Sequence, residues 1–280
     1  MIETICICGA GTMGSGIAQV AAQSGFKTIQ FDVDVAMVEK SKVALHKNFQ
    51  SLVDKGRLTE EEKTASIGRT QFTNNINECK ADVIIEAIIE KKEAKVHLFK
   101  QLAEINNNET ILATNTSSLS INSIAEELRN SERVVGMHFF NPAPLMKLVE
   151  VVKGEQTTNQ VVELICELTR QLGKTPVVCK DVPGFIVNRV ARPYYLEAMK
   201  LIEAGVVDFE TIDRIMEATG FKMGPFKLMD LIGMDINYSV SNIVWEALGK
   251  PSRLTPSSIQ RQKVDAGELG KKTSKGFYSY

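Results

Sequence analysis

The first 32 residues constrain the fold of this chain more than any other stretch. An apolar run at residues 2–8 (IETICIC) leads into a glycine-rich segment at residues 9–14 (GAGTMG), and a second apolar run, residues 27–31 (KTIQF), ends at Asp32. This order predicts a strand, a tight turn, a helix and a second strand, followed by a carboxylate about 20 residues after the glycines. A glycine-rich turn alone is weak evidence, but here the flanking segments agree with it.

The glycine-rich segment also predicts a site for a dinucleotide. Gly9 would allow the tight turn, Gly11 would let the backbone approach a pyrophosphate, and Gly14 would let the helix pack closely on the strand. Thr12 and Met13 stand where the predicted helix starts. The free N–H groups and the positive dipole end at that point would face the phosphates.

The acidic residues after the second predicted strand indicate which dinucleotide is bound. Asp32 stands at the carboxyl end of that strand, where it would accept hydrogen bonds from the adenosine ribose hydroxyls. Asp34 adds a second negative charge nearby, which we expect to repel a 2′-phosphate. The sequence therefore favours NAD over NADP as the cofactor.

Composition and charge exclude several classes of partner. The chain has 280 residues, of which 44% are hydrophobic and 24% charged, and its formal net charge is −1. Such a balance argues against nucleic acid or an anionic membrane as the main partner. No run approaches the roughly 18 apolar residues of a membrane helix. The five scattered cysteines show no metal-ligand spacing, so we expect reduced thiols, no metal site and a cytoplasmic location.

The pattern along the chain changes near Pro183. Before it, short apolar runs alternate with helical stretches, which predicts an α/β fold with a Rossmann-like, doubly wound and mostly parallel sheet. After it, only helical stretches follow, at residues 185–204, 208–219, 225–248 and 256–267. We therefore expect an NAD-binding domain at residues 1–183 and an all-helical C-terminal domain at residues 184–280.

Among the three histidines, His138 stands out by its position. His46 and His97 lie in lysine-rich helical segments, which is typical of surface residues. His138 ends a predicted strand, and ligands of open α/β sheets bind beyond the carboxyl ends of the strands. On this evidence alone, His138 could equally be a core histidine or a catalyst.

Five motifs together make the sequence recognisable. They are residues 9–14 (GAGTMG), 115–118 (NTSS), 138–142 (HFFNP), 147–152 (KLVEVV) and 183–189 (PGFIVNR). In this order and spacing they resemble the L-3-hydroxyacyl-CoA dehydrogenase family, most closely its short single-function 3-hydroxybutyryl-CoA dehydrogenases. The resemblance extends to the C-terminal segment at residues 270–278 (GKKTSKGFY).

The resemblance implies a catalytic set. His138 would be the general base, Glu150 its carboxylate partner, and Ser117 and Asn188 the groups that hold the substrate oxygens. A neutral imidazole near pH 7 suits removal of a hydroxyl proton, and a carboxylate would fix its tautomer. Read without the family, Ser117 could cap a helix, Asn188 could be a surface residue, and Glu150 could lie on a solvated strand face.

The resemblance also implies further contacts. Glu90, Lys95 and Asn115 match positions near the cofactor, although Glu90 and Lys95 could also be a solvated pair on one helix. The lysine-rich helix expected at residues 36–55 matches the region that meets coenzyme A, so an acyl-CoA is the expected substrate. Residues 221–226 and 230–233 match stretches used for packing and dimerisation, which implies a homodimer through the helical domain.

Three functions are compatible with these features. The leading hypothesis is NAD-dependent interconversion of L-3-hydroxyacyl-CoA and 3-ketoacyl-CoA. The main alternative keeps the fold and the chemistry but uses a free hydroxy acid, as in the related L-gulonate dehydrogenases. A third is an NAD-binding protein without catalysis, which would have no need for His138, Glu150, Ser117 and Asn188 together.

Overall fold

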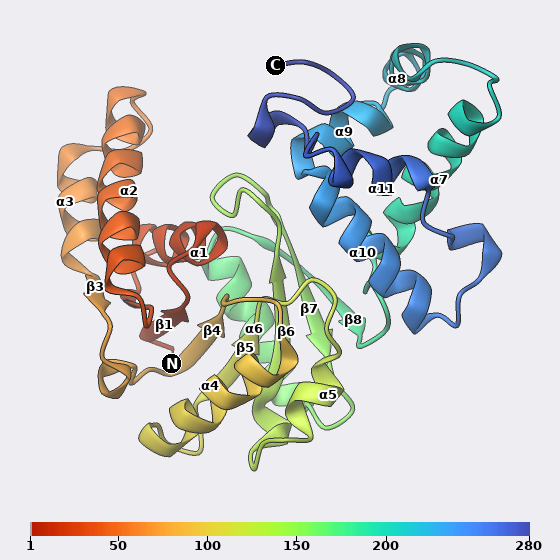
Figure 1. The fold of residues 1–280 in the computed structure, drawn as a ribbon. Helices are drawn as coiled ribbons and strands as arrows, with labels where there is room; N and C mark the ends of the chain where they lie inside the picture. Colours follow the sequence, from red (N-terminus) through yellow and green to blue (C-terminus); the bar gives the residue numbers. More distant parts are fainter. Residues whose placement is uncertain (1) are drawn as a thin grey trace. The chain divides into compact units, whose positions relative to one another are not determined.

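The computed structural model describes residues 2–280, and their contacts divide the chain after Asp181 into two compact units (Figure 1). The first unit contains all the strands of the structure and six α-helices. The second unit, Val182–Tyr280, contains the remaining helices. Each unit has its own hydrophobic core. The described residues contain no helix that is both long and apolar enough to cross a membrane.

The sheet of the first unit has eight strands in the order β3-β2-β1-β4-β5-β6-β7-β8. They are β1 (Thr4–Cys8), β2 (Lys27–Phe31), β3 (Thr70–Thr73), β4 (Val83–Glu86), β5 (Ile111–Thr114), β6 (Val134–Phe139), β7 (Leu148–Lys153) and β8 (Thr175–Lys180). Neighbours from β3 to β6 are parallel, β7 is antiparallel to β6, and β8 is parallel to β7. The predicted doubly wound, mostly parallel sheet is confirmed.

The strand order reverses between β1 and β4, because the chain crosses to one side after β1 and to the other after β3. In such sheets, the crevice at this reversal, beyond the carboxyl ends of the strands, is where ligands bind. The strands around it are mostly apolar and almost wholly buried: all residues of β4 and β6 and four of five in β1 are buried. This is expected for strands covered by helices on both faces.

Six α-helices belong to this unit: α1 (Thr12–Gln23), α2 (Val35–Asp54), α3 (Glu60–Gly68), α4 (Lys92–Ile105), α5 (Ile121–Ala125) and α6 (Asn159–Gln171). Figure 1 shows α2 and α3 side by side. Thr59 and Glu62 form a capping box at the start of α3, as their Thr-x-x-Glu spacing predicts. Helix α5 is short, because the N–H groups of Glu127 and Leu128 bond to carbonyl oxygens three residues back and close the segment as a turn.

The glycine-rich turn has the geometry that its sequence predicts. Gly9 has φ +112°, a conformation that side chains disfavour, and Gly11 precedes α1. A Cβ on Gly14 would lie 1.8 Å from the carbonyl oxygen of Gly9, so only glycine lets α1 approach the end of β1 this closely. A Cβ on Gly11 would meet no atom within 4 Å, so open space adjoins this residue.

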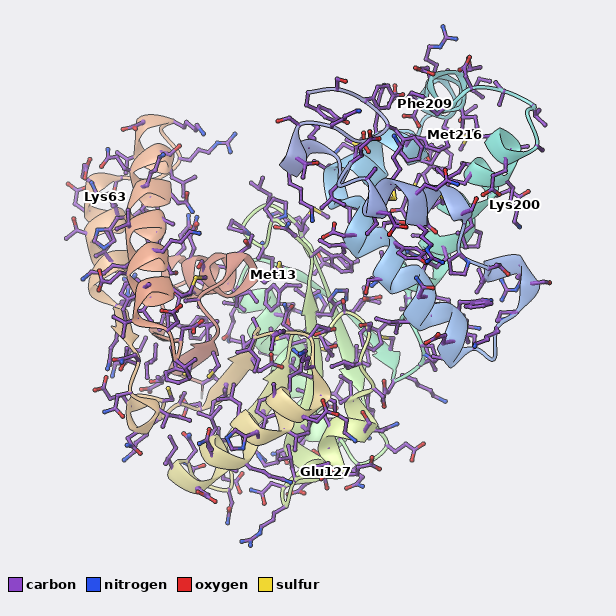
Figure 2. The ribbon with its side chains drawn as sticks, in the orientation of Figure 1. Met13, Lys63, Glu127, Lys200, Phe209 and Met216 are labelled. Atoms are coloured by element: carbon purple, nitrogen blue, oxygen red, sulfur yellow. The ribbon has the colours of Figure 1, made fainter. Side chains whose placement is uncertain are left out.

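The second unit is helical, with α7 (Val187–Glu203), α8 (Phe209–Ala218), α9 (Pro225–Ile232), α10 (Met234–Ala247) and α11 (Ser258–Asp265). The single helix expected at residues 225–248 is wrong: Gly233, with φ +105°, separates α9 from α10. Phe209 and Met216, labelled in Figure 2, pack on the core of this unit from α8. An aromatic cluster lies there, in which the rings of Phe226 and Phe277 are 4.7 Å apart.

Replacing Gly14 with alanine tests the close packing of α1 on β1. Alanine favours helices over glycine by about 1 kcal/mol, so without the close contact the variant would be stabilised. Because the added Cβ overlaps the Gly9 carbonyl, we expect Gly14→Ala to lower the free energy of unfolding by about 1–3 kcal/mol, measured by urea denaturation. Gly11→Ala, which adds its Cβ into open space, is the matched control. Equal stability of the two variants would contradict this account.

Candidate active site

His138 and Glu150 form a buried pair near the carboxyl edge of the sheet. They are directly opposite in the antiparallel pair of β6 and β7, with His138 Nδ1 2.7 Å from Glu150 Oε2. Glu150 is fully buried and His138 is 5% exposed. A Glu150 carboxylate can accept the Nδ1 proton of a neutral imidazole and so fix its tautomer.

A second buried carboxylate, Glu86, ends β4 and holds Lys95. Glu86 Oε1 accepts hydrogen bonds from Lys95 Nζ and from the backbone N–H of Ile88, both at 2.7 Å. Its Oε2 accepts one from Thr114 Oγ1 at 2.7 Å. Burial raises the pKa of Glu86, and the Lys95 ammonium opposes that rise. Lys95 itself is 1% exposed, so it is not part of a solvated pair on a helix.

Lys95 also contacts Glu90, which organises the loop after β5. Lys95 Nζ lies 3.1 Å from Glu90 Oε2. Glu90 Oε1 accepts hydrogen bonds from Thr116 Oγ1 at 2.6 Å and from the N–H of Ser117 at 3.0 Å. Although burial acts against it, the Lys95 charge together with these hydrogen bonds lowers the pKa of Glu90. Ser117 therefore sits in a loop that is fixed through two carboxylates and one ammonium group.

Asn115 connects this loop to the strand that carries His138. Its Oδ1 accepts a hydrogen bond from the N–H of Phe139 at 2.8 Å, and its own N–H donates to the carbonyl oxygen of Glu86. The side chain thus links the ends of β5 and β6. Asn115 is a structural part of this edge, whatever else it contacts.

Asp32 lies directly after β2 and holds the glycine-rich turn. Its Oδ2 accepts a hydrogen bond from the N–H of Ala10 at 2.8 Å, and its Oδ1 accepts one from the N–H of Asp34 at 3.0 Å. Thr12 and Met13 form the start of α1. The first turn of α1 and the open space beside Gly11 fit a pyrophosphate, which backbone N–H groups at a helix start bind well. The residues present therefore fit a dinucleotide.

Asn188 belongs to the second unit, in the first turn of α7. Its carbonyl oxygen accepts a hydrogen bond from Arg192 Nε at 3.0 Å. The other expected site residues lie in the first unit. There the structure brings together the His138–Glu150 pair, the Glu90–Lys95 pair with the loop of Asn115 and Ser117, and the turn of Gly9, Gly11 and Gly14 with Asp32, at one edge of the sheet.

Sequence reasoning missed Glu86, Thr114 and Thr116. A signal for Glu86 was present, because it is the one acidic residue in an otherwise apolar strand at the point where that strand ends. The hydroxyl groups of Thr114 and Thr116 gave no such signal, since threonine is common in strands and loops. Their roles depend on which carboxylate each hydroxyl meets in the fold.

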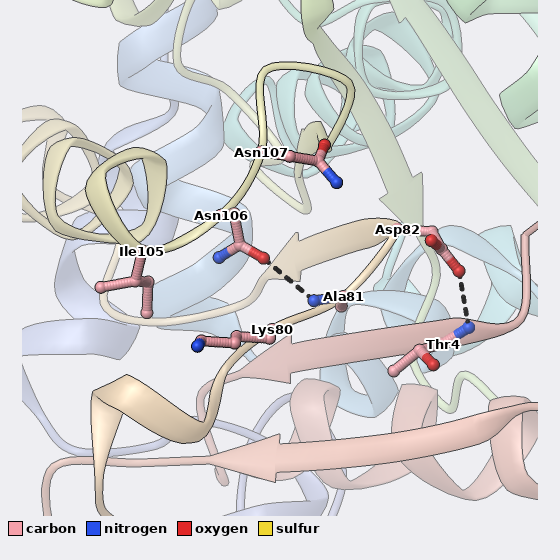
Figure 3. Close-up of a pocket in the computed structure, with 7 residues that line it drawn as sticks. All are labelled: Thr4, Lys80, Ala81, Asp82, Ile105, Asn106 and Asn107. Carbon is pink, nitrogen blue, oxygen red and sulfur yellow. Dashed lines mark hydrogen bonds between the residues drawn. The ribbon is translucent and has the colours of Figure 1, made fainter.

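A pocket at the opposite edge of the sheet is a poor candidate for the site. It lies at the amino ends of β1 and β4 and is lined in part by Thr4, Asp82 and Asn106 (Figure 3). Asp82 Oδ2 accepts a hydrogen bond from the N–H of Thr4 at 2.9 Å, and Asn106 Oδ1 accepts one from the N–H of Ala81 at 3.0 Å. These side chains therefore serve as acceptors for backbone N–H groups next to the starts of β1 and β4. Among residues 2–280, no cluster of three or more His, Cys, Asp or Glu side chains could hold a metal ion.

Comparison with known proteins agrees with this geometry. Residues 4–182 match the family model of the 3-hydroxyacyl-CoA dehydrogenase NAD binding domain, and residues 184–280 match that of the C-terminal domain. A protein of Deinococcus radiodurans, named probable 3-hydroxybutyryl-CoA dehydrogenase, is 41% identical over 98% of this chain and 99% of its own length. The 3-hydroxyadipyl-CoA dehydrogenase of Escherichia coli is 46% identical over the whole chain, which spans only 59% of that protein.

Solved structures give the same result. The (S)-3-hydroxybutyryl-CoA dehydrogenase from Ralstonia eutropha has a TM-score of 0.95 at 36% sequence identity, covering all of this chain and 99% of that one. Two matching domain models cover almost the whole chain. This chain belongs to the 3-hydroxyacyl-CoA dehydrogenase family, and its N-terminal domain is the NAD-binding domain of that family.

Proposed function

We propose that this chain interconverts an L-3-hydroxyacyl-CoA and the 3-ketoacyl-CoA, with NAD(H) as the cofactor. The observation that carries the proposal is the buried pair of His138 and Glu150, 2.7 Å apart, in the domain that binds NAD. An imidazole with one nitrogen held by a carboxylate is suited to taking a proton from a secondary alcohol. The acyl-CoA substrate fits the family to which the chain belongs.

In the oxidation, His138 Nε2 would take the hydroxyl proton as the C3 hydrogen leaves as hydride. NAD⁺ supplies the hydride acceptor. Glu150 would keep the proton of the neutral ring on Nδ1 and stabilise the imidazolium after proton transfer. In the reverse direction, the imidazolium would return its proton to the 3-keto oxygen.

Ser117 and Asn188 are proposed to hold the substrate oxygens, where a hydroxyl and an amide can donate hydrogen bonds to developing negative charge. We assign Glu90, Lys95 and Asn115 to the cofactor, together with Gly9, Gly11, Thr12, Met13, Gly14 and Asp32 at its phosphates and ribose. The helical domain would bind the substrate and form the dimer interface.

The acyl chain itself is a separate question. The names of the relatives specify two kinds of chain, an uncharged four-carbon chain and a six-carbon chain that ends in a carboxylate. Both have the hydroxyl at C3, so the proposed chemistry is the same for each. The short acyl-CoA is the class that we propose.

The direct test is the loss of NADH absorbance with acetoacetyl-CoA, beside NADPH and beside free acetoacetate. We expect turnover with NADH and the thioester. A preference for NADPH would contradict the role of Asp32. Turnover of a free hydroxy acid but not of the thioester would move the chain to the L-gulonate type of dehydrogenase, and NADH binding without turnover of either would indicate a binding protein.

Substituting the proposed base gives the sharpest prediction for the mechanism. We expect His138→Gln to lower kcat by about 10²- to 10⁴-fold, because glutamine cannot accept the proton. NADH affinity, measured by fluorescence titration, should be retained. His97→Gln, an exposed histidine on α4, is the control that should keep full activity. Activity of His138→Gln equal to that of His97→Gln would remove His138 from the mechanism.

Glu86→Gln tests the network behind Lys95. The amide keeps the size of the side chain but removes the charge that faces Lys95 Nζ, so the ammonium group keeps only Glu90. A hydrogen bond to a charged group is worth about 1.5–3 kcal/mol, so we expect kcat/KM to fall about tenfold or more. Thr114→Ser keeps the hydroxyl that bonds to Glu86 and is the control. An unchanged kcat/KM in Glu86→Gln would show that Glu90 alone is enough to hold the Lys95 ammonium group in place.

A homodimer through the helical domain is also proposed. The second unit exposes several large apolar side chains, including Val190 at 71%, Val206 at 66% and Ile215 at 55%. Such surface is costly in water and is commonly covered by a partner subunit. Sedimentation at micromolar concentration should therefore give about twice the chain mass of 30.9 kDa. A stable monomer under these conditions would contradict the dimer.

A further inference from the structure

A chain of three polar side chains in the first unit ends at the glycine-rich turn. Ser15 Oγ, on α1, donates a hydrogen bond to the carbonyl oxygen of Ala10 at 3.0 Å and lies 2.7 Å from Ser41 Oγ, on α2. Ser41 Oγ in turn lies 2.8 Å from Oε1 of Gln30, on β2. Gln30 and Ser41 are buried between these elements, and Ser15 is half-buried. Gln30, Ser41 and Ser15 together are termed the Gln30 relay.

The number of protons in the relay determines the direction of its hydrogen bonds. The Ala10 carbonyl can only accept, so the Ser15 proton is used there. The contact between the two serines then needs the Ser41 proton, and the contact with Gln30 needs a donor on the amide. With Oε1 beside Ser41, Nε2 of Gln30 is buried without a hydrogen-bond partner among the described residues. Exchanging the two amide atoms supplies the donor and leaves an unpaired carbonyl oxygen, which is less costly than an unpaired N–H.

Ala10 is held on both sides, by Asp32 and by the relay. Its N–H donates to Asp32 Oδ2 at 2.8 Å, and its carbonyl oxygen accepts from Ser15 Oγ. Among residues 2–280, the Ser15 hydroxyl gives the only hydrogen bond that this carbonyl accepts. The peptide group between Ala10 and Gly11 is trans and planar, so its carbonyl and its N–H point in opposite directions. Fixing the Ala10 carbonyl therefore fixes the direction of the Gly11 N–H.

The N–H of Gly11 points away from the relay. Within the described residues it donates no hydrogen bond, and a Cβ on Gly11 would meet no atom within 4 Å. Gly11 directly precedes α1, whose first N–H groups favour an anion. Without the hydrogen bond from Ser15, the peptide group could rotate and turn this N–H away from the pyrophosphate that the proposed function assigns to the turn.

We propose that the Gln30 relay orients the glycine-rich turn for the cofactor, with Ser15 and Ser41 as positioning residues for the pyrophosphate of NAD(H). The two hydroxyl groups act through the Gly11 N–H and do not touch the cofactor themselves. The proposal rests on the proposed function only in assigning Gly11 to the phosphates, and it is independent of the acyl substrate. Hydrogen bonds that run in one direction along a chain strengthen one another, so the middle of the relay supports the bond to Ala10.

Replacing Ser15 with alanine tests the relay through cofactor binding. We expect Ser15→Ala to raise the Kd of NADH, measured by fluorescence titration, about 5- to 20-fold, because the Ala10 carbonyl loses its donor. The Kd of ADP-ribose, measured by calorimetry, should rise by the same factor, since this ligand has the pyrophosphate but no nicotinamide. At saturating NADH, kcat and the KM of acetoacetyl-CoA should stay within about twofold of the wild-type values.

Two further variants act on the relay in different ways. Ser41→Ala removes its middle member but leaves the Ser15 hydroxyl in place, so we expect a smaller rise in both Kd values, about 2- to 5-fold. Ser15→Thr keeps a hydroxyl group, and the Kd of NADH should stay within about twofold of the wild-type value. Ser41→Ala tests the proposal even if Ser15→Ala fails to fold, and wild-type Kd values in Ser41→Ala would overturn it.

The control is Ser66→Ala on α3, because the Ser66 hydroxyl is also buried and donates to a backbone carbonyl, that of Glu62 at 2.8 Å. It should lower the thermal unfolding midpoint and leave both Kd values unchanged. A relay with a purely structural role predicts the same result for Ser15→Ala, and that outcome would overturn the proposal. A rise in Kd for NADH but not for ADP-ribose would overturn it as well. A wild-type chain that binds NADH but does not reduce acetoacetyl-CoA would instead overturn the proposed function.

Discussion

Two buried carboxylates, Glu86 and Glu150, determine how the carboxyl edge of the sheet is built. Both are fully buried, and an ionised carboxylate in that position is tolerated only with a partner that offsets the loss of water. Glu86 meets the ammonium group of Lys95, and Glu150 meets the imidazole of His138, each at 2.7 Å. Because each contact also fixes the cationic or basic partner, the carboxylates set the positions of Lys95 and His138.

The sheet explains why these contacts occur at one edge. Parallel strands deliver the ends of β1, β2, β4, β5 and β6 to the same side, which collects the glycine turn, Asp32, Glu86 and Asn115 there. Glu150 is the exception, since it lies in the antiparallel strand β7. It reaches the edge because the register of β6 and β7 places it directly opposite His138.

Local sequence patterns predict the order of the strands and helices. They do not predict the contacts between side chains that lie far apart in the chain. The order of strands and helices followed from apolar periodicity, and the capping box of Thr59 and Glu62 followed from a four-residue signature. The break at Gly233 was missed because apolar residues continue at helical spacing on both sides of it. The link from Glu86 to Lys95 and on to Glu90 joins the end of one strand to a helix and a loop, and no local pattern encodes which carboxylate an ammonium group will reach.

The three buried cations among the described residues, Lys95, Lys174 and Arg192, differ in how their charge is balanced. Lys95 lies between two carboxylates, with its Nζ 2.7 Å from Glu86 Oε1 and 3.1 Å from Glu90 Oε2. Arg192 has about the same burial but only carbonyl, hydroxyl and aromatic neighbours. Lys174 is likewise held by carbonyl oxygens, because its Nζ donates to those of Ala143, Pro144 and Met146. In this fold, backbone carbonyl dipoles can therefore hold a buried cation where no carboxylate is present, which is the second way of offsetting the loss of water.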